Sequence, residues 1–284
     1  MSYSSLEIGD VAISFAGRGK EPVWELETAY RAFVTDREPD IEVLMRQGCP
    51  IAPMGNRIFD NPPIWSMYRQ NATVAIQIFH HLASQEQKRT LVFSHPLRTA
   101  DLCFHGKSCQ FTSPSYGPTL ELLMINYLAQ GKGVVIHTCG IERAGKGILF
   151  VGESGAGKST LARLWDEAGA EVLSDDRIIV RKKRDRFWMY GTPWHGDASF
   201  TSPRGVTVER MLFLRQGREN SIKEIKGIDS VSRLITCGFL PHWDSQGMVF
   251  SMDFLTDLAA HVPCSEFTFK PDKSAIEIVK EITA

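Results

Sequence analysis

The stretch Gly147-Ile148-Leu149-Phe150-Val151-Gly152-Glu153-Ser154-Gly155-Ala156-Gly157-Lys158-Ser159-Thr160 decides the fold of this chain. Its apolar first part, Gly147 to Val151, predicts a buried β-strand. The residues after it match the pattern G-x-x-x-x-G-K-[ST] at every fixed position. A helix is expected from Thr160 to Ala168, followed by another buried strand from Glu171 to Leu173. A strand, glycine loop, helix and strand in this order indicate an α/β fold.

The glycine loop has the chemistry of a polyphosphate cradle. Gly152 and Gly157 allow positive φ angles and a close approach of the backbone, so that successive N–H groups point toward an anion. Lys158 is expected to reach the β- and γ-phosphates of ATP, and Ser159 to ligate Mg²⁺. A chance glycine-rich turn is the alternative, which the strand-to-helix context argues against. The predicted nucleotide-binding residues of the loop are Gly152, Glu153, Ser154, Gly155, Ala156, Gly157, Lys158, Ser159 and Thr160.

Two carboxylates follow the strand after the loop. Asp175 and Asp176 come at the carboxyl end of that strand, where ligands bind in α/β sheets. Because neighbouring side chains on a strand point in different directions, one carboxylate can face Mg²⁺ while the other faces an acceptor hydroxyl. A carboxylate that accepts the acceptor's proton is the usual positioning device in phosphoryl transfer. A solvated turn with two Asp residues is the alternative.

Composition excludes several classes of protein. The 284 residues are 43% hydrophobic, which is enough for one large core or two ordinary ones. The 32 Lys and Arg residues balance 33 Asp and Glu residues, so neither nucleic acid nor a membrane surface is an expected partner. No signal segment or membrane span is visible, and a cytoplasmic location is expected. The cysteines lack metal-ligand spacing and are expected to be reduced: Cys49, Cys103, Cys109, Cys139, Cys237 and Cys264.

The first part of the chain predicts a β-rich domain over residues 1–117, and the boundary is the turn-rich stretch Thr112 to Pro118. The segment Ile76 to Ser84 reads equally well as a helix. This domain is expected to hold or cover the acceptor substrate. The expected strands are Leu6 to Phe15, Ala32 to Thr35, Ile41 to Met45, Ala72 to Phe79, Thr90 to Ser94 and Ala100 to Phe104.

The second part, residues 118–284, predicts the ATP-binding catalytic domain, with a mainly helical C-terminal portion. Its further expected strands are Gly133 to Cys139, Ile178 to Lys182, Phe187 to Tyr190 and Val208 to Leu214. Its further expected helices are Thr119 to Gln130, Ser230 to Phe239, Gln246 to His261 and Ser274 to Glu281.

Three segments together resemble a known family. They are His137 to Gly140, the loop Gly152 to Thr160, and the stretch Glu167 to Arg177 that contains both aspartates. In this order they are similar to the catalytic domain of HPr kinase/phosphorylase, which is itself similar to phosphoenolpyruvate carboxykinase. The resemblance covers Leu120 to Leu214. It implies a P-loop kinase core of the HPr kinase C-terminal, phosphoenolpyruvate carboxykinase-like type, beside the β-rich N-terminal domain.

The resemblance also implies roles for individual residues. Lys158 holds the phosphates, Ser159 and Asp176 hold Mg²⁺, and Asp175 acts as the base toward an acceptor serine. His137 matches a histidine placed near the transferred phosphate, so the implied catalytic residues are Asp175, Lys158 and His137. Without the family, a single histidine on an apolar strand would be read as a hydrogen-bonded core residue.

The sequence departs from the family near Ser202-Pro203-Arg204-Gly205, where HPr kinase has glutamate-x-arginine-glycine. Arg204 is kept and is expected to contact the nucleotide, but the carboxylate is missing. Asp197 or His195, in the segment Gly191 to Asp197, could restore the lost contact. This departure, and a first domain without similarity to the HPr kinase N-terminal domain, argue against HPr itself as the substrate.

The function expected from these features is an ATP-dependent kinase that phosphorylates a serine or threonine of a protein or peptide. Relatives of this kind include peptide-tailoring kinases, and a homo-oligomer is expected. A small-molecule kinase is the second hypothesis. The third is a nucleotide-gated regulatory protein without catalysis, for which the missing carboxylate at Ser202 is the supporting feature.

Overall fold

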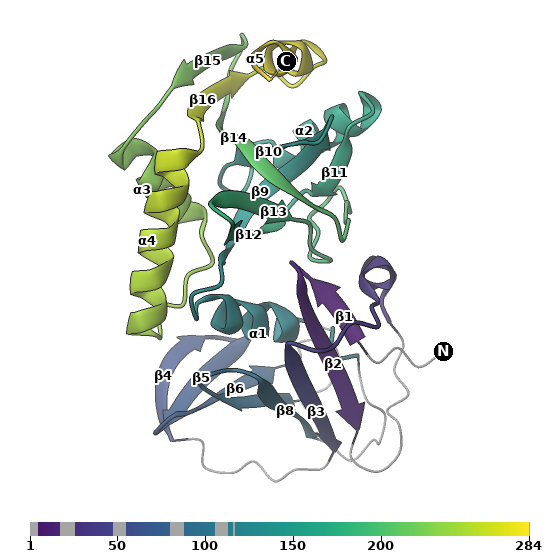
Figure 1. Cartoon of the computed structure of the whole chain (residues 1–284), viewed down its shortest axis with the longest axis vertical. Helices are drawn as coiled ribbons and strands as arrows, with labels where there is room; N and C mark the ends of the chain where they lie inside the picture. The colour runs from purple at the N-terminus through teal and green to yellow at the C-terminus, as the bar shows by residue number, and fades with distance from the viewer. Residues whose placement is uncertain are drawn as a thin grey trace. The chain divides into compact units, whose positions relative to one another are not determined.

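The computed structural model describes residues 5–17, 26–47, 55–79, 88–105, 113–115 and 117–283. The chain divides into two compact units (Figure 1), one formed by Met1–Glu7 with Val11–Tyr127 and the other by Ile8–Asp10 with Leu128–Ala284. The helix after the expected boundary at residue 117 therefore groups with the first unit. The assignment of functional domains to 1–117 and 118–284 stays a prediction.

The first unit is built on one eight-stranded sheet in the order β1-β2-β3-β8-β7-β6-β5-β4. β3 pairs in parallel with β2 and β8, and the neighbours from β8 to β4 are antiparallel. Its elements are β1 (Ser5–Ile8), β2 (Val11–Gly17), the 3-10 helix η1 (Thr28–Phe33), β3 (Ile41–Gln47), β4 (Asn56–Asn61), β5 (Trp65–Gln70), β6 (Thr73–Phe79), β7 (Lys88–Ser94), β8 (Thr99–His105) and α1 (Thr119–Leu128).

Several expectations for this unit need correction. β6 shows that residues 73–79 are a strand, so the helical reading of that stretch is wrong, and residues 80–84 lie outside the described part. The strand expected at 32–35 is wrong in its first half, which belongs to η1, where Tyr30 and Phe33 are buried at the three-residue spacing of a 3-10 helix. In its second half Val34 forms an isolated antiparallel bridge with Leu6. β4 was not expected, since none of its residues is buried and its sequence carries no alternation.

The second unit contains strands that close into a ring. β10 pairs with both β9 and β14, and β12 and β13 connect β9 to β14 on the other side. β16 and β15 extend the sheet beyond β14, and β11 pairs with β9. Its elements are β9 (Val134–Arg143), β10 (Lys146–Val151), α2 (Lys158–Glu167), β11 (Glu171–Ser174), β12 (Arg177–Lys183), β13 (Arg186–Tyr190), β14 (Gly205–Gln216), β15 (Ser221–Glu224), α3 (Ile228–Cys237), α4 (Ser245–His261), β16 (Cys264–Phe269) and α5 (Ser274–Ile282).

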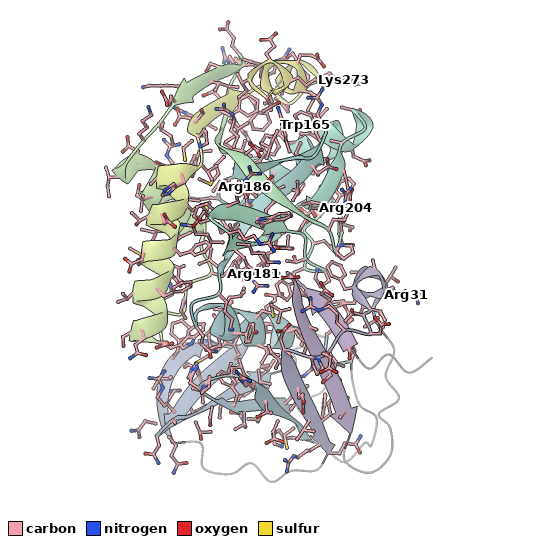
Figure 2. The ribbon with its side chains drawn as sticks, viewed as in Figure 1. Arg31, Trp165, Arg181, Arg186, Arg204 and Lys273 are labelled. Atoms are coloured by element: carbon pink, nitrogen blue, oxygen red, sulfur yellow. The ribbon has the colours of Figure 1, made fainter. Side chains whose placement is uncertain are left out.

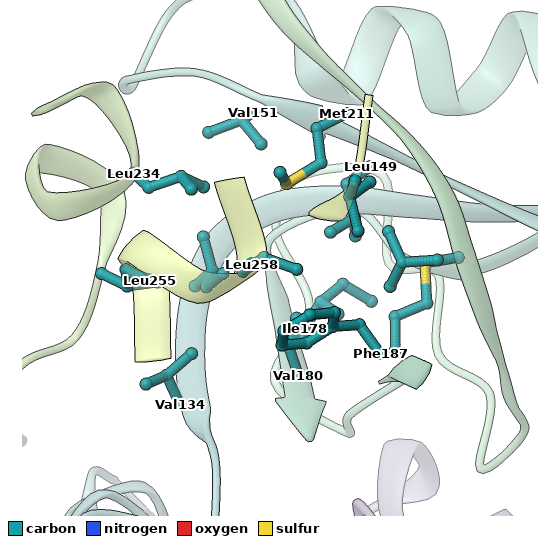
Figure 3. Packing of buried hydrophobic residues seen from close by; sticks show 14 of the residues in the cluster. Val134, Leu149, Val151, Ile178, Val180, Phe187, Met211, Leu234, Leu255 and Leu258 are labelled. Atoms are coloured by element: carbon teal, nitrogen blue, oxygen red, sulfur yellow. The ribbon is translucent and has the colours of Figure 1, made fainter. Parts of the chain in front are cut away.

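Alternation along β10 explains the two cores of this unit. Leu149 and Val151 face one hydrophobic cluster, and Ile148 and Phe150 face the other. The first cluster fills the strand ring and continues onto α3 and α4 (Figure 3). The second lies between the sheet, α2 and α5, and it includes the fully buried Trp165 (Figure 2). Because both faces of β10 are buried, its sequence is continuously apolar, as expected for a central strand.

The helices α2, α3, α4 and α5 confirm the expected helices of the second part, whereas β15 and β16 had not been expected in a mainly helical portion. Cys139, Cys237 and Cys264 are free, but Cys103 is disulfide-bonded, which corrects the expectation of uniformly reduced cysteines. Disulfide formation depends on the spatial distance between two cysteines, which sequence spacing does not reveal. In the described part of the chain, no helix combines the length and apolarity needed to cross a membrane.

Candidate functional site

The glycine loop lies between the end of β10 and the start of α2, as its sequence predicts. Gly157 precedes the helix with φ 103°, a left-handed conformation that favours glycine. A Cβ atom at this position would lie 2.5 Å from Cζ of Phe269 on β16. Both the backbone angle and the neighbouring ring therefore require glycine here.

Lys158 folds back over the loop. Its Nζ donates hydrogen bonds to the carbonyl oxygens of Gly152 (2.9 Å) and Glu153 (3.0 Å), and only 6% of the residue is exposed. Burial lowers the pKa of Lys158, although the nearby Asp176 carboxylate opposes the shift. The buried Lys158 ammonium is poorly solvated by water. The negative charge of an incoming phosphate would therefore stabilise it.

Asp175 connects the first turn of α2, which follows the glycine loop, to a distant segment. Its Oδ2 accepts a 3.1 Å hydrogen bond from Ser159 Oγ and a 2.9 Å bond from the Ala198 N–H. Its Oδ1 accepts a 3.0 Å bond from the Gly196 N–H. The residue is 1% exposed, so both oxygens are enclosed by these donors. The segment 196–198 is thereby held beside the first turn of α2.

Asp176 points to a different set of partners. Its Oδ1 lies 3.0 Å from His137 Nε2, and its Oδ2 lies 3.5 Å from Arg177 Nε. Burial raises the pKa of Asp176, but the hydrogen bond from His137 and the Arg177 charge outweigh it, and the pKa is lowered overall. The His137 side chain is 25% exposed and is not enclosed in the core. The pairing of His137 with Arg177 across β9 and β12 fixes this arrangement.

A cavity of about 460 Å³ brings these groups together. The sheet order places the β9 and β11 residues on one side of the loop and β14 on the other. Arg163 and Gln216 also line the cavity, although the sequence did not single them out. The position of Gln216 at the carboxyl end of β14 was the available signal, because ligands bind at such ends. The lining residues are His137, Ser154, Gly155, Gly157, Lys158, Ser159, Thr160, Arg163, Asp175, Asp176, Gly196, Asp197 and Gln216.

Other predicted loop residues face elsewhere. Gly152, Glu153 and Ala156 line a second cavity of about 460 Å³, bounded by the end of β14 and by α3. This second cavity shares Ser154 and Gly155 with the first. The glycine loop therefore forms a wall between two hollows.

Arg204 does not line either of these cavities. Its side chain, labelled in Figure 2, is 57% exposed and pairs with Glu171 and with Glu142, the latter at 3.3 Å. Ser202 stands where HPr kinase has a glutamate, and its Oγ donates a 2.7 Å hydrogen bond to Glu171. Of the two residues expected to compensate, Asp197 lines the first cavity, beside Lys158 and Ser159, and His195 does not.

Oxygen atoms that can ligate a metal ion predominate in the part of the cavity next to Ser159. Across the described ranges, no group of three or more His, Cys, Asp or Glu side chains is arranged to hold a metal ion. Ser159 Oγ and the two aspartates are nevertheless the kind of oxygen ligand that suits Mg²⁺, which takes one or two protein carboxylates together with phosphates and water.

Two known proteins are similar in sequence to about half of this chain. HPr kinase/phosphorylase from Lachnoclostridium phytofermentans is 28% identical over 143 residues, covering 50% of this chain and 44% of that protein. The Chlorobium limicola protein of the same name is 26% identical over 158 residues, covering 55% of this chain and 44% of that protein. The chain thus spans less than half the length of these relatives. No protein-family model matches the chain.

One solved structure, the Hpr(Ser) kinase/phosphatase from Coxiella burnetii, aligns over 52% of this chain and 87% of its own, with a TM-score of 0.32 and 13% identity. The fold assignment depends instead on the strand, glycine loop, helix and strand order of the second unit, which is α/β. The sequence similarity shows that about half of this chain is similar to HPr kinase/phosphorylases.

Proposed function

We propose that this protein transfers the γ-phosphoryl group of ATP to a serine or threonine hydroxyl of a protein or peptide. The observation that carries the proposal is one cavity lined by both Lys158 and Ser159 of the glycine loop and by Asp175, Asp176 and His137. The names of the sequence relatives support the same reaction class. A small precursor peptide of a peptide-tailoring system is one acceptor of this kind, and a homo-oligomer remains part of the proposal.

The triphosphate would lie along the glycine loop. Backbone N–H groups of the loop and the positive end of α2 attract its oxygens. Mg²⁺ would be held by Ser159 together with an aspartate, and it would neutralise the charge on the β- and γ-phosphates. Lys158 is already directed over the loop by the carbonyl oxygens of Gly152 and Glu153.

The two aspartates would divide the work according to their partners. Asp175 touches Ser159 and has both oxygens engaged, which suits a metal-side, positioning role. Asp176 is less buried and is bonded by His137, so it is the better candidate for the base. This division reverses the one that the family resemblance implies.

In the proposed step, an acceptor hydroxyl oxygen attacks the γ-phosphorus while Asp176 accepts the hydroxyl proton. The bond from the γ-phosphorus to the β,γ-bridging oxygen breaks, and its electrons leave with ADP. The hydrogen bond from His137 Nε2 orients the Asp176 carboxylate. The lowered pKa of Asp176 keeps this group ionised at neutral pH, as a proton acceptor requires, but it also makes the carboxylate a weaker base.

The direct test incubates the protein with γ-labelled ATP, Mg²⁺ and a panel of hydroxyl-bearing acceptors, including synthetic precursor peptides and HPr. Transfer of label to a serine or threonine supports the proposal. Asp176→Asn is expected to lower kcat by about 10²- to 10⁴-fold while the Kd for ATP changes little. If Asp175→Asn abolishes transfer and Asp176→Asn does not, the proposed division of roles is wrong.

Two other functions would give different results in the same assay. Label found on a small hydroxylated metabolite and never on polypeptide would favour a small-molecule kinase. Tight ATP binding without ADP formation across all acceptors would favour a nucleotide-gated regulatory protein. The feature that supported this last reading is the missing carboxylate at Ser202, and that position does not line the phosphate cavity.

A further inference from the structure

The neighbours of β10 overhang the glycine loop on both sides. Val151, the last residue of β10, is in register with Phe213 of β14, and β14 continues in parallel to Gln216. Three further residues of strand extend about 10 Å, so the end of β14 forms a wall beside the loop. On the other side Val151 is in register with Thr138 of β9, and His137 lies just past that pair.

The cavity therefore has two chemically different ends. His137, Asp175 and Asp176 lie at the end next to β9 and β11, where the proposed transfer takes place. Gln216 lies at the opposite end, next to β14. A triphosphate whose γ-phosphate faces Asp176 has its α-phosphate, and the nucleoside attached to it, toward the Gln216 end.

The side chain of Gln216 suits a nucleoside contact. Its Nε2 donates a 2.8 Å hydrogen bond to the carbonyl oxygen of Gly155, which directs the carboxamide over the loop. The second Nε2 hydrogen donates no hydrogen bond to a described residue, and Oε1 accepts none from one. A carboxamide with one donor and one acceptor available can bond both to ribose hydroxyls and to the polar edge of a base.

We infer that Gln216 binds the nucleoside part of the nucleoside triphosphate, as a residue of the nucleotide site that neither the motif nor the resemblance assigns. The inference rests on the proposed function, because it takes the γ-phosphate to lie at the Asp176 end. The second cavity, lined on its far side by Thr236 and Cys237 of α3, is the rival location for the nucleoside.

Inorganic tripolyphosphate separates nucleoside binding from phosphate binding. Titration calorimetry with Mg²⁺ would compare the Kd values of ATP and tripolyphosphate for the wild-type chain, Gln216→Ala and Gln216→Met. Gln246→Ala is the matched control, because it removes the same carboxamide from an exposed position on α4 outside the cavity. Thermal unfolding of each variant confirms that it is folded.

The expected result is a rise of about 3- to 10-fold in the Kd for ATP in both Gln216 variants, with the Kd for tripolyphosphate unchanged. An equal weakening of both ligands would show that Gln216 only supports the loop through Gly155, and would overturn the inference. Unchanged binding of both ligands would overturn it as well. Failure of the wild-type chain to bind either ligand would instead refute the proposed function itself.

Discussion

Ser159 Oγ donates a 3.1 Å hydrogen bond to the Asp175 carboxylate, joining the first turn of α2 to the residue that follows β11. The same carboxylate accepts the N–H groups of Gly196 and Ala198. One buried aspartate therefore connects the first turn of α2, the end of β11 and the 196–198 segment. A substitution in any one of these parts is expected to change the stability of the other two, because all three are linked through Asp175.

Substitution of Asp175 tests this connection. Asp175→Asn replaces one carboxylate oxygen by an amide group that cannot accept a hydrogen bond from a backbone N–H. We expect the free energy of unfolding to fall by about 1–3 kcal/mol, the cost of a buried unpaired donor. In a double-mutant cycle with Ser159→Ala, measured by urea unfolding, the two effects should be non-additive by about 0.5 kcal/mol or more. Strict additivity would contradict the connection.

The lowered pKa of Asp176 makes stability depend on pH. An aspartate has a pKa near 3.9 in the unfolded chain, and that of Asp176 is lower in the folded protein. The hydrogen bond from His137 and the charge of Arg177 therefore contribute stability that is fully present above about pH 4 and is lost as pH falls through the lowered pKa of Asp176. Urea unfolding at successive pH values should show the free energy of unfolding of the wild type exceeding that of Asp176→Asn above about pH 4. This difference should shrink as pH falls through the lowered pKa.

His137→Ala provides the control for this pH dependence. The hydrogen bond from His137 is the main influence that lowers the pKa of Asp176, so its removal should bring the pKa of that carboxyl back up. The difference in pH dependence between this variant and a His137→Ala, Asp176→Asn double variant should then shrink. An unchanged difference would mean that His137 is not the partner that matters.

Two glycines with positive φ flank α2, and only one of them lacks room for a side chain. Comparing them separates the cost of a steric clash from the cost of a left-handed backbone. Gly157 has φ 103° and Gly169 has φ 79°, but a Cβ on Gly169 would meet no atom within 4 Å. Gly169→Ala is expected to cost about 1–2 kcal/mol in the free energy of unfolding, for the left-handed backbone alone. Gly157→Ala should cost more and should abolish ATP binding, since its Cβ meets the Phe269 ring. Equal costs in thermal unfolding would show that the ring moves aside.

Arg204 offers a test of the original expectation that it contacts the nucleotide. Its exposed guanidinium pairs with Glu142 and Glu171 outside the phosphate cavity. Arg204→Ala should therefore leave the Kd for ATP unchanged and lower stability by at most about 1 kcal/mol, the range for an exposed pair. Calorimetry that shows a tenfold weaker Kd for ATP would restore the predicted contact.

Much of the second unit could be predicted from local patterns. The continuous apolar run of β10, the glycines of the loop and the amphipathic helices carry their own periodicity. β15 and β16 could not be found in this way, because β16 pairs with β14 and β15 pairs with β16, and β16 is distant in sequence from both partners. In the first unit β4 carries no alternating burial, so only its pairing with β5 makes it a strand.

By itself the sequence determined the glycine loop between β10 and α2, because its glycines followed by Lys158 and Ser159 set the backbone geometry within a few residues. It also determined that two carboxylates follow the next strand. Only the tertiary structure decided which carboxylate meets which partner. Asp175 is bonded by Ser159 and by residues 196–198, Asp176 is bonded by His137, and Arg204 is turned away from the cavity. These contacts depend on the register of β9 against β11 and β12, which hydrophobic pattern does not encode.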